Sequence, residues 1–297
     1  MEKDMLFVYN PVSGRAQIRD SLAEIIETFT KSGYRVTVPP TAKRSDCFEY
    51  FSKHAGEFDV VSVCGGDGML NETVSALMQF PPDKRPPIAY LPAGSTNDFA
   101  ASVGLAADLK TCVKKITAGE PFLCDAGQFC DKYFSYIAAF GAFTSVAYDT
   151  SQELKNTFGH FAYVVEGIRS FAAIKATHMK ITYENKTIED NFIYGMITNT
   201  MQVGGILRTN GTNKVSLNDG LFEVLLVKEA KSALDFQAIL SAIITQNLSS
   251  NLFVWFKASE IILESDLPIP WTLDGEYGGN VSSAKIANIP RAFSVIV

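Results

Sequence analysis

The first half of the chain alternates short apolar runs with segments of helical periodicity. Runs of apolar and β-branched residues predict strands at residues 6–10, 34–40, 58–64 and 86–92. Apolar residues three and four positions apart predict helices at residues 21–33, 45–58 and 69–80. Strands and helices that alternate in this rhythm are typical of a parallel sheet wrapped by helices. In such a sheet, ligands bind beyond the carboxyl ends of the strands.

The second half follows a different pattern, which begins near residue 128. Strand-like runs separated by turns lie at residues 132–140, 177–185, 186–199, 220–229, 259–265 and 285–297. Helical segments are predicted at residues 159–173 and 232–246. This pattern predicts an antiparallel sandwich or a barrel-like domain. The chain has 297 residues, which is long for a single hydrophobic core, so we expect two domains with a boundary near residues 125–129.

Composition and the pattern of cysteines and histidines argue against two kinds of function, nucleic-acid binding and zinc binding. Hydrophobic residues make up 47% of the chain and charged residues 20%, which is typical of a globular protein. The net charge of -6 argues against a nucleic-acid partner, because surfaces that bind nucleic acid are basic. The five cysteines contain no CxxC motif, which indicates reduced thiols in a cytoplasmic protein. The three histidines form no HExxH motif, so we expect no zinc site.

Three polar loops follow strands of the predicted first domain. They are NPVSGR at 10–15, GGDG at 65–68 and PAGSTNDF at 92–99. Glycines let the backbone approach a ligand closely, and the helix that follows each loop presents free amide groups to an anion. Because these loops stand at corresponding positions of one sheet, together they predict a phosphate-binding site.

The second loop contains an aspartate, Asp67, although a bare carboxylate repels phosphate. The P-loop, dinucleotide and protein-kinase motifs are absent from the sequence. A magnesium ion would remove the repulsion, because it binds one or two carboxylates together with phosphate oxygens. We therefore expect Asp67 to bind magnesium or the waters on it. The alternative is a turn aspartate that caps the next helix.

Four motifs, taken in order, resemble those of the lipid kinase family, which contains soluble bacterial diacylglycerol kinases and the sphingosine and ceramide kinases. The motifs are NPVSGR, VCGGDGMLNETVSAL, LPAGSTNDFA and WTLDGEYGG, and they span residues 10–279. NAD kinases share the GGDG element, but NPVSG and GSTNDFA resemble the lipid branch. The resemblance implies a three-layer α/β nucleotide-binding domain at residues 1–127 and a β-sandwich-like domain at residues 128–289. It also implies an active-site cleft between the two domains, and a last strand at about 290–297 that returns to the first domain.

The resemblance also assigns residues to the site. The implied ATP-binding residues are Asn10, Pro11, Val12, Ser13, Gly14, Thr41, Gly65, Gly66, Asp67, Gly68, Met69, Leu70, Asn71, Ser95 and Asn97. Asp98 would join Asp67 in a network of magnesium and water. Glu276 would be the general base that takes the proton from the lipid hydroxyl. Arg15, Arg19, Lys43 and Arg44 are basic residues that face either phosphate and lipid headgroups or only solvent.

A second magnesium site is implied by the element SLNDGLF, which resembles a structural metal site of the bacterial members. Asp219 would supply a carboxylate there, and Ser216 and Leu221 would supply backbone carbonyls. The alternative is an Asn-Asp-Gly hairpin turn that holds no metal.

The sequence departs from the family pattern at two positions. Met69 stands where relatives commonly have threonine after GGDG, which removes one hydroxyl contact to phosphate. Ser95 replaces the threonine of a Gly-Thr pair and keeps its hydroxyl. We expect these changes to tune nucleotide affinity and not to abolish activity.

The sequence therefore predicts a lipid kinase that transfers the γ-phosphate of ATP·Mg, with diacylglycerol as the leading acceptor. It would act at the inner face of the membrane, and a homodimer is one option because bacterial relatives often dimerise. Two alternatives stay open at this point. One is a kinase for a soluble acceptor, as in the NAD kinases, and the other is a regulator that binds nucleotide or lipid without transfer.

Overall fold

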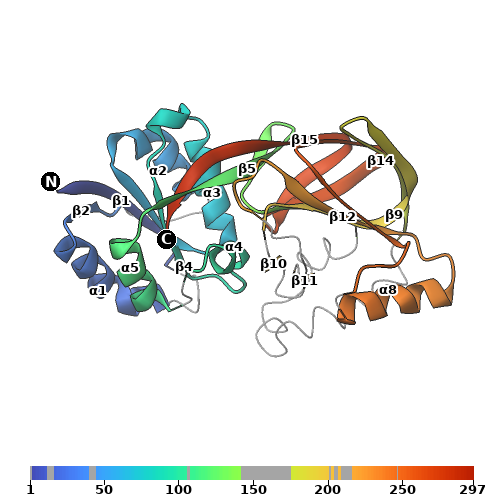
Figure 1. Cartoon of the computed structure of the whole chain (residues 1–297). Helices are drawn as coiled ribbons and strands as arrows, with labels where there is room; N and C mark the ends of the chain where they lie inside the picture. The colour runs from blue at the N-terminus through green and yellow to red at the C-terminus, as the bar shows by residue number, and fades with distance from the viewer. Residues whose placement is uncertain are drawn as a thin grey trace.

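The computed structural model describes residues 2–11, 17–39, 45–105, 108–141, 175–200, 202–203, 207–208, 216–245 and 247–297. These residues form an α/β part and a β-rich part, which lie side by side and are joined by long strands (Figure 1). The helix predicted at residues 159–173 lies outside the described residues.

The α/β part is built on a parallel sheet with the strand order β2–β1–β3–β4. Its strands are β1 (Lys3–Tyr9), β2 (Tyr34–Thr37), β3 (Val60–Gly65) and β4 (Ile88–Pro92). β3 and β4 are buried along their whole length, as central strands covered on both faces should be. The parallel architecture predicted for the first half is confirmed.

Helices cover both faces of this sheet. They are α1 (Gln17–Lys31), α2 (Asp46–His54), α3 (Asp67–Leu77), α4 (Asp98–Ser102) and α5 (Leu109–Ala118), with 3₁₀ turns at Ala55–Glu57 and Pro82–Lys84. Helices α1 and α5 pack together on one face, and α2 and α3 pack together on the other (Figure 1). Helix α1 begins earlier than predicted, because Ile18 extends the buried apolar stripe that Ile25 and Phe29 continue.

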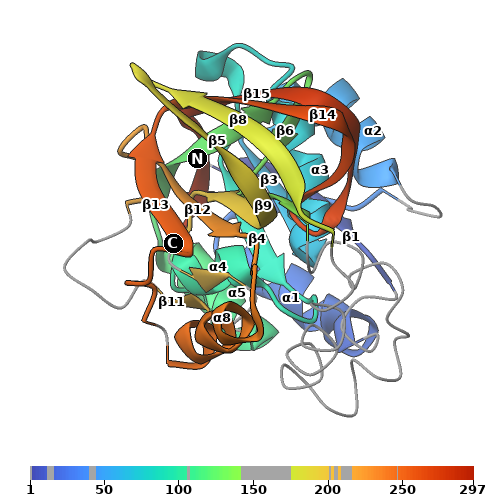
Figure 2. The same cartoon turned by 90° about the vertical axis from the view of Figure 1, so that its right-hand side faces the viewer.

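The described residues of the β-rich part form antiparallel strands and one helix. These are β6 (Lys132–Phe134), β7 (Ile137–Gly141), β8 (Thr177–Tyr183), β9 (Lys186–Thr198), β10 (Gln202–Val203), β11 (Leu207–Arg208), β12 (Phe222–Lys228), α8 (Ala233–Thr245), β13 (Phe253–Ala258) and β14 (Glu260–Leu273). Helix α8 lies on the side away from β14 (Figures 1 and 2). The strand predicted at 132–140 is split between β6 and β7, because the backbone turns there to donate hydrogen bonds to Asp274.

Two strands connect the two parts. They are β5 (Pro121–Phe129) and β15 (Glu276–Ile296), which pair antiparallel with each other. The early part of β15 pairs with β14, and its end lies parallel to β4 through Val295 and Ile88. The chain therefore leaves the α/β part on β5 and returns to it on β15 (Figure 1). Glu276, the first residue of β15, therefore lies on a strand that pairs with strands of both parts.

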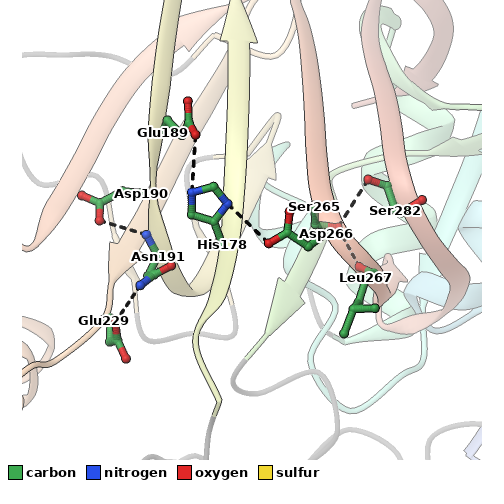
Figure 3. Close-up of polar contacts among 9 residues, drawn as sticks. All are labelled: His178, Glu189, Asp190, Asn191, Glu229, Ser265, Asp266, Leu267 and Ser282. Carbon is green, nitrogen blue, oxygen red and sulfur yellow. Dashed lines mark hydrogen bonds and ion pairs between the residues drawn. The ribbon is translucent and has the colours of Figure 1, made fainter.

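The core of the β-rich part and its surface differ sharply in polarity. Trp271 is buried, and its ring centroid lies 4.9 Å from those of Phe129 and Phe140. On the surface, His178 of β8 lies between Glu189 of β9 and Asp266 of β14, at 3.5 and 3.6 Å (Figure 3). Water screens such exposed contacts, so they add little stability.

Among the described residues, no helix is long and apolar enough to cross a membrane.

Candidate active site

The loops after β1, β3 and β4 meet at the carboxyl edge of the parallel sheet. The amide of Asn10 donates to the carbonyl of Cys64, 3.1 Å away, and the amide of Ala93 donates to the carbonyl of Gly65, 2.8 Å away. These bonds join the first loop to β3 and the third loop to the second. The convergence expected from strand ends is therefore present for the described parts of the three loops.

Two glycines allow the second and third loops to touch. A Cβ atom on Gly94 would lie 2.5 Å from the Cα of Gly66 and 2.8 Å from the Oδ1 of Asn97, which leaves no space for a side chain. Asn97 adopts a left-handed backbone conformation with φ of 54°. Its side-chain amide closes a ring with Gly94, donating to the carbonyl at 3.0 Å and accepting from the amide at 2.9 Å.

Asp67 is the first residue of α3, but it does not cap that helix, which has Gly66 at its N-cap. Its Oδ2 accepts from the amide of Asp98 at the start of α4, 3.3 Å away. The side chain is buried, and its Oδ1 has no hydrogen-bond partner among the described residues. Burial, followed by the charges of Asp98 and Asp274, raises the pKa of Asp67 to about 7. A buried carboxylate oxygen without a partner suits a cation at this position.

Asp274 is the residue that sequence reasoning missed. Its buried carboxylate accepts five hydrogen bonds, at distances from 2.6 to 3.0 Å, and the donors are Asn71 Nδ2, Ser135 N, Ser135 Oγ, Tyr136 N and Ile137 N. The backbone of Asp274 is left-handed, with φ of 50°. In the motif WTLDGEYGG the resemblance assigns a role only to Glu276, and the donors to Asp274 lie far away in the sequence, so no local signal identifies this role. Burial raises the pKa of Asp274, although these hydrogen bonds oppose the rise.

Asp274 fixes the turn that leads to Glu276. The side chain of Glu276 lies over the phosphate-type loop, because a Cβ atom on Gly68 would be 3.2 Å from its Oε1. Asn71 of α3 links the two parts directly, since its amide donates to Asp274 at 2.8 Å and to the carbonyl of Tyr133 at 3.0 Å. The structure therefore brings together Asp67 and Gly68, Asp98, and Glu276 from three distant positions in the sequence.

The remaining residues predicted to contact ATP lie in different surroundings. Ser95 is exposed within the third loop. The carbonyl of Pro11 accepts a hydrogen bond from Arg19 Nε at 3.0 Å. The side chain of Leu70 is fully buried in the core, so only its backbone faces the loop. The side chain of Met69 packs on Gly65, where an added Cβ atom would lie 2.4 Å from its Sδ. The predicted residues Val12, Ser13, Gly14 and Thr41, and the basic Arg15, Lys43 and Arg44, lie outside the described residues.

Among the described residues, the carboxylates of the site do not form a complete set of metal ligands by themselves. In the part of the chain that the structure describes, no three His, Cys, Asp or Glu side chains converge closely enough to form a metal site. Magnesium commonly binds through one or two carboxylates together with substrate phosphates and water. Asp67 and Asp98 fit that incomplete arrangement, since they offer buried carboxylates next to two helix N-termini.

The second predicted metal element is a turn at residues 216–221 before β12. Asp219 Oδ1 accepts from the amide of Leu221 at 3.1 Å, and Ser216 Oγ donates to Asn218 Oδ1 at 3.0 Å. Asp219 Oδ2 lies 3.6 Å from the ammonium nitrogen of Lys257. The assignment of Ser216, Asp219 and Leu221 as magnesium ligands stays a prediction.

Comparisons with known proteins agree with this arrangement. Residues 4–129 match the family described as "Diacylglycerol kinase catalytic domain", and residues 139–297 match the "YegS C-terminal NAD kinase beta sandwich-like domain". A diacylglycerol kinase of Bacillus subtilis strain 168 is 30% identical over 98% of this chain and 95% of that protein.

Solved structures extend the likeness to the fold. A crystal structure of a protein assigned to the diacylglycerol kinases of Bacillus anthracis has a TM-score of 0.83 at 23% identity, over 99% of this chain and 95% of that one. An NAD kinase from Archaeoglobus fulgidus, solved in complex with ATP, has a TM-score of 0.50 at 12% identity, over 99% and 92%. The two-domain fold is therefore that of the diacylglycerol and NAD kinases, and the chain belongs to the diacylglycerol kinase catalytic-domain family.

Proposed function

We propose that this protein is an ATP-dependent lipid kinase that phosphorylates the free hydroxyl of diacylglycerol. One observation carries the proposal. Glu276, from the β-rich part, lies directly over Gly68 in the GGDG loop of the α/β part. A carboxylate base next to a phosphate-type loop suits transfer of a phosphoryl group to an alcohol. The choice of diacylglycerol rests on the names of the bacterial relatives.

The nucleotide would bind over the three glycine-containing loops. The first amides of α3 have no partner within the helix and can donate to phosphate oxygens. The close contact of Gly66 with Gly94 keeps both loops flat enough for such an approach. We assign ATP to Asn10, Pro11, Gly65, Gly66, Gly68, Met69, Ser95 and Asn97, and by motif match to Val12, Ser13, Gly14 and Thr41. In this assignment Leu70 contributes backbone, and Asn71 acts through Asp274.

Asp67 and Asp98 would hold the magnesium ion together with the phosphates. When bound, the ion would neutralise charge on the transferred phosphoryl group. The raised pKa of Asp67 supports this assignment, because a cation would relieve the repulsion from Asp98 and Asp274.

Glu276 would accept the proton of the lipid hydroxyl. The hydroxyl oxygen then forms a bond to the γ-phosphorus, the bond from that phosphorus to the bridging oxygen breaks, and ADP leaves with the electron pair. Asp274 acts as a positioning residue, since its five hydrogen bonds fix the turn that carries Glu276. Because ATP is an intracellular substrate, we propose that the enzyme meets its lipid at the inner face of the membrane. A homodimer is part of the same proposal.

The test is transfer of labelled γ-phosphate from ATP to lipids in mixed micelles. The acceptors would be diacylglycerol, monoacylglycerol, sphingosine and ceramide, with NAD as a water-soluble acceptor. We expect label in phosphatidic acid and a loss of about 10²–10⁴-fold in turnover for Glu276→Gln, with ATP binding retained. Glu264→Gln, an exposed glutamate on β14, is the control and should match the wild type. Label only in NADP, or full turnover in Glu276→Gln, would contradict the proposal.

A further inference from the structure

A lysine lies beside the turn at residues 216–221. Lys257 of β13 faces Glu223 of β12 across the antiparallel pair, and its Nζ lies 2.8 Å from Glu223 Oε1. The same nitrogen lies 3.6 Å from Asp219 Oδ2. Lys257 therefore bridges a carboxylate of the turn and a carboxylate of the strand that follows it.

Glu223 has little access to water, so its charge depends on this lysine. Only 1% of the residue is exposed, and its Oε2 has no hydrogen-bond partner among the described residues. The ion pair with Lys257 is therefore the charged contact that reaches this buried carboxylate. A single ammonium group therefore lies between two carboxylates, one of them buried.

Each oxygen of Asp219 has a neighbouring donor group, since Oδ1 accepts from the amide of Leu221 at 3.1 Å and Oδ2 lies 3.6 Å from the ammonium of Lys257. We propose that the ammonium of Lys257 is the resident cation of this turn, so that the turn keeps its structure without a divalent ion. The magnesium implied by the resemblance would have to compete with Lys257 for Asp219. This inference does not rest on the proposed kinase activity.

The turn matters because it holds the two connecting strands. Asp125 of β5 is fully buried, and its carboxylate accepts from the amide of Gly220 and from the amide of Arg291 in β15, both at 2.7 Å. The amide of Asp125 donates to the carbonyl of Leu217, also at 2.7 Å. Arg291 is left-handed, with φ of 51°, at the point where the pairing of β15 with β5 shifts. Through its hydrogen bonds with Asp125, the turn at residues 216–221 is attached to β5 and β15 where these strands run from one part to the other.

The test compares thermal unfolding of the full chain, without nucleotide, in EDTA and in excess Mg²⁺. We expect the wild type to unfold at the same temperature in both. Lys257→Met should lower the midpoint by about 5–10 °C, because it leaves a buried carboxylate without its cation. Lys285→Met is the matched control. It breaks an ion pair with Glu260 at 2.9 Å on exposed side chains and should shift the midpoint by less than about 2 °C.

A double variant separates charge from packing. Glu223→Gln combined with Lys257→Met removes the buried charge and should recover most of the lost midpoint, and it serves as the measurable protein if the single variant does not fold. Two results would overturn the proposal. The first is a wild-type midpoint that falls in EDTA by an amount that Asp219→Asn abolishes. The second is a Lys257→Met variant that unfolds like Lys285→Met.

Discussion

The buried carboxylates of the candidate active site and those beside the turn at 216–221 differ in what balances their charge. Glu223 has an ammonium 2.8 Å away, on a neighbouring strand. Asp67 and Asp274 have no ion-pair partner among the described residues, although both are buried. Neutral hydrogen-bond donors serve these aspartates instead. A backbone amide donates to Asp67, and three backbone amides, one side-chain amide and one hydroxyl donate to Asp274.

The difference is the one expected between a structural ion pair and a carboxylate that binds a cation together with a ligand. A lysine that stays in place satisfies its carboxylate permanently, and the fold benefits at all times. A carboxylate without a cation carries an unfavourable charge until a ligand arrives, which raises its pKa. Lys257 offsets the cost of burying Glu223, whereas the proposed role of Asp67 needs a cation that arrives with the nucleotide.

The largest effect is expected from Asp274→Asn. This variant tests whether hydrogen bonds from neutral donors, without a cation, stabilise a buried carboxylate. The new amide group would point an N–H at donors that now face an oxygen, so several buried donors would lose their acceptor. We expect the free energy of unfolding to fall by about 3–5 kcal/mol. Turnover should fall by about 10²-fold, because Glu276 loses its support.

Chemical denaturation and turnover measure these two losses. The control is Asp266→Asn, an aspartate with a side chain that is 79% exposed beside His178 (Figure 3), and its effect should stay within about 0.5 kcal/mol. Equal free energies of unfolding for the two variants would mean that the hydrogen bonds of Asp274 do not stabilise the fold.

A smaller effect is expected from pH, and it tests the uncompensated charge of Asp67. Burial, then Asp98 and Asp274, raise the pKa of this group from 3.8 to about 7. A pKa that is higher in the folded protein means that the stabilising proton is lost as pH rises toward 7. Without ATP and magnesium, the wild type should therefore lose about 2–3 kcal/mol relative to Asp67→Asn between about pH 5 and pH 8.

Urea unfolding of both proteins across this range measures the difference. Parallel stability curves for the wild type and Asp67→Asn would show that the charge of Asp67 is already balanced within the protein, which removes the contrast with Glu223. Added ATP with magnesium should bring the curves together if the ion binds at Asp67.

Sequence reasoning succeeded where the signal is local. The periodicity of α1 and the apolar runs of β3 and β4 predicted a parallel sheet, and the carboxyl ends of its strands then placed Gly66 and Gly94 at one edge. It erred where side chains far apart in the sequence decide the backbone. The run at 132–140 reads as one strand, yet Asp274, more than a hundred residues later, splits it.

The same limit applies to the charges. No sequence pattern near Glu223 predicts its ion pair with Lys257, because the register between β12 and β13 brings these two residues together. The motif WTLDGEYGG pointed to Glu276, but the role of Asp274 depends on partners that only the folded chain assembles. The assignments of single residues to ATP and magnesium stay predictions for the same reason.

The smallest effect is expected at Met69, where the sequence departs from its family beside the active-site carboxylates. The methionine packs on Gly65 and offers phosphate no hydroxyl. Met69→Thr restores a hydroxyl, so KM for ATP should fall by about 2–5-fold while kcat changes by less than about twofold. Lost packing should cost about 1 kcal/mol of unfolding free energy. Met69→Leu, which keeps the apolar volume and adds no hydroxyl, should leave KM unchanged. If leucine and threonine shifted KM equally, packing on Gly65 and not contact with phosphate would set nucleotide affinity at this position.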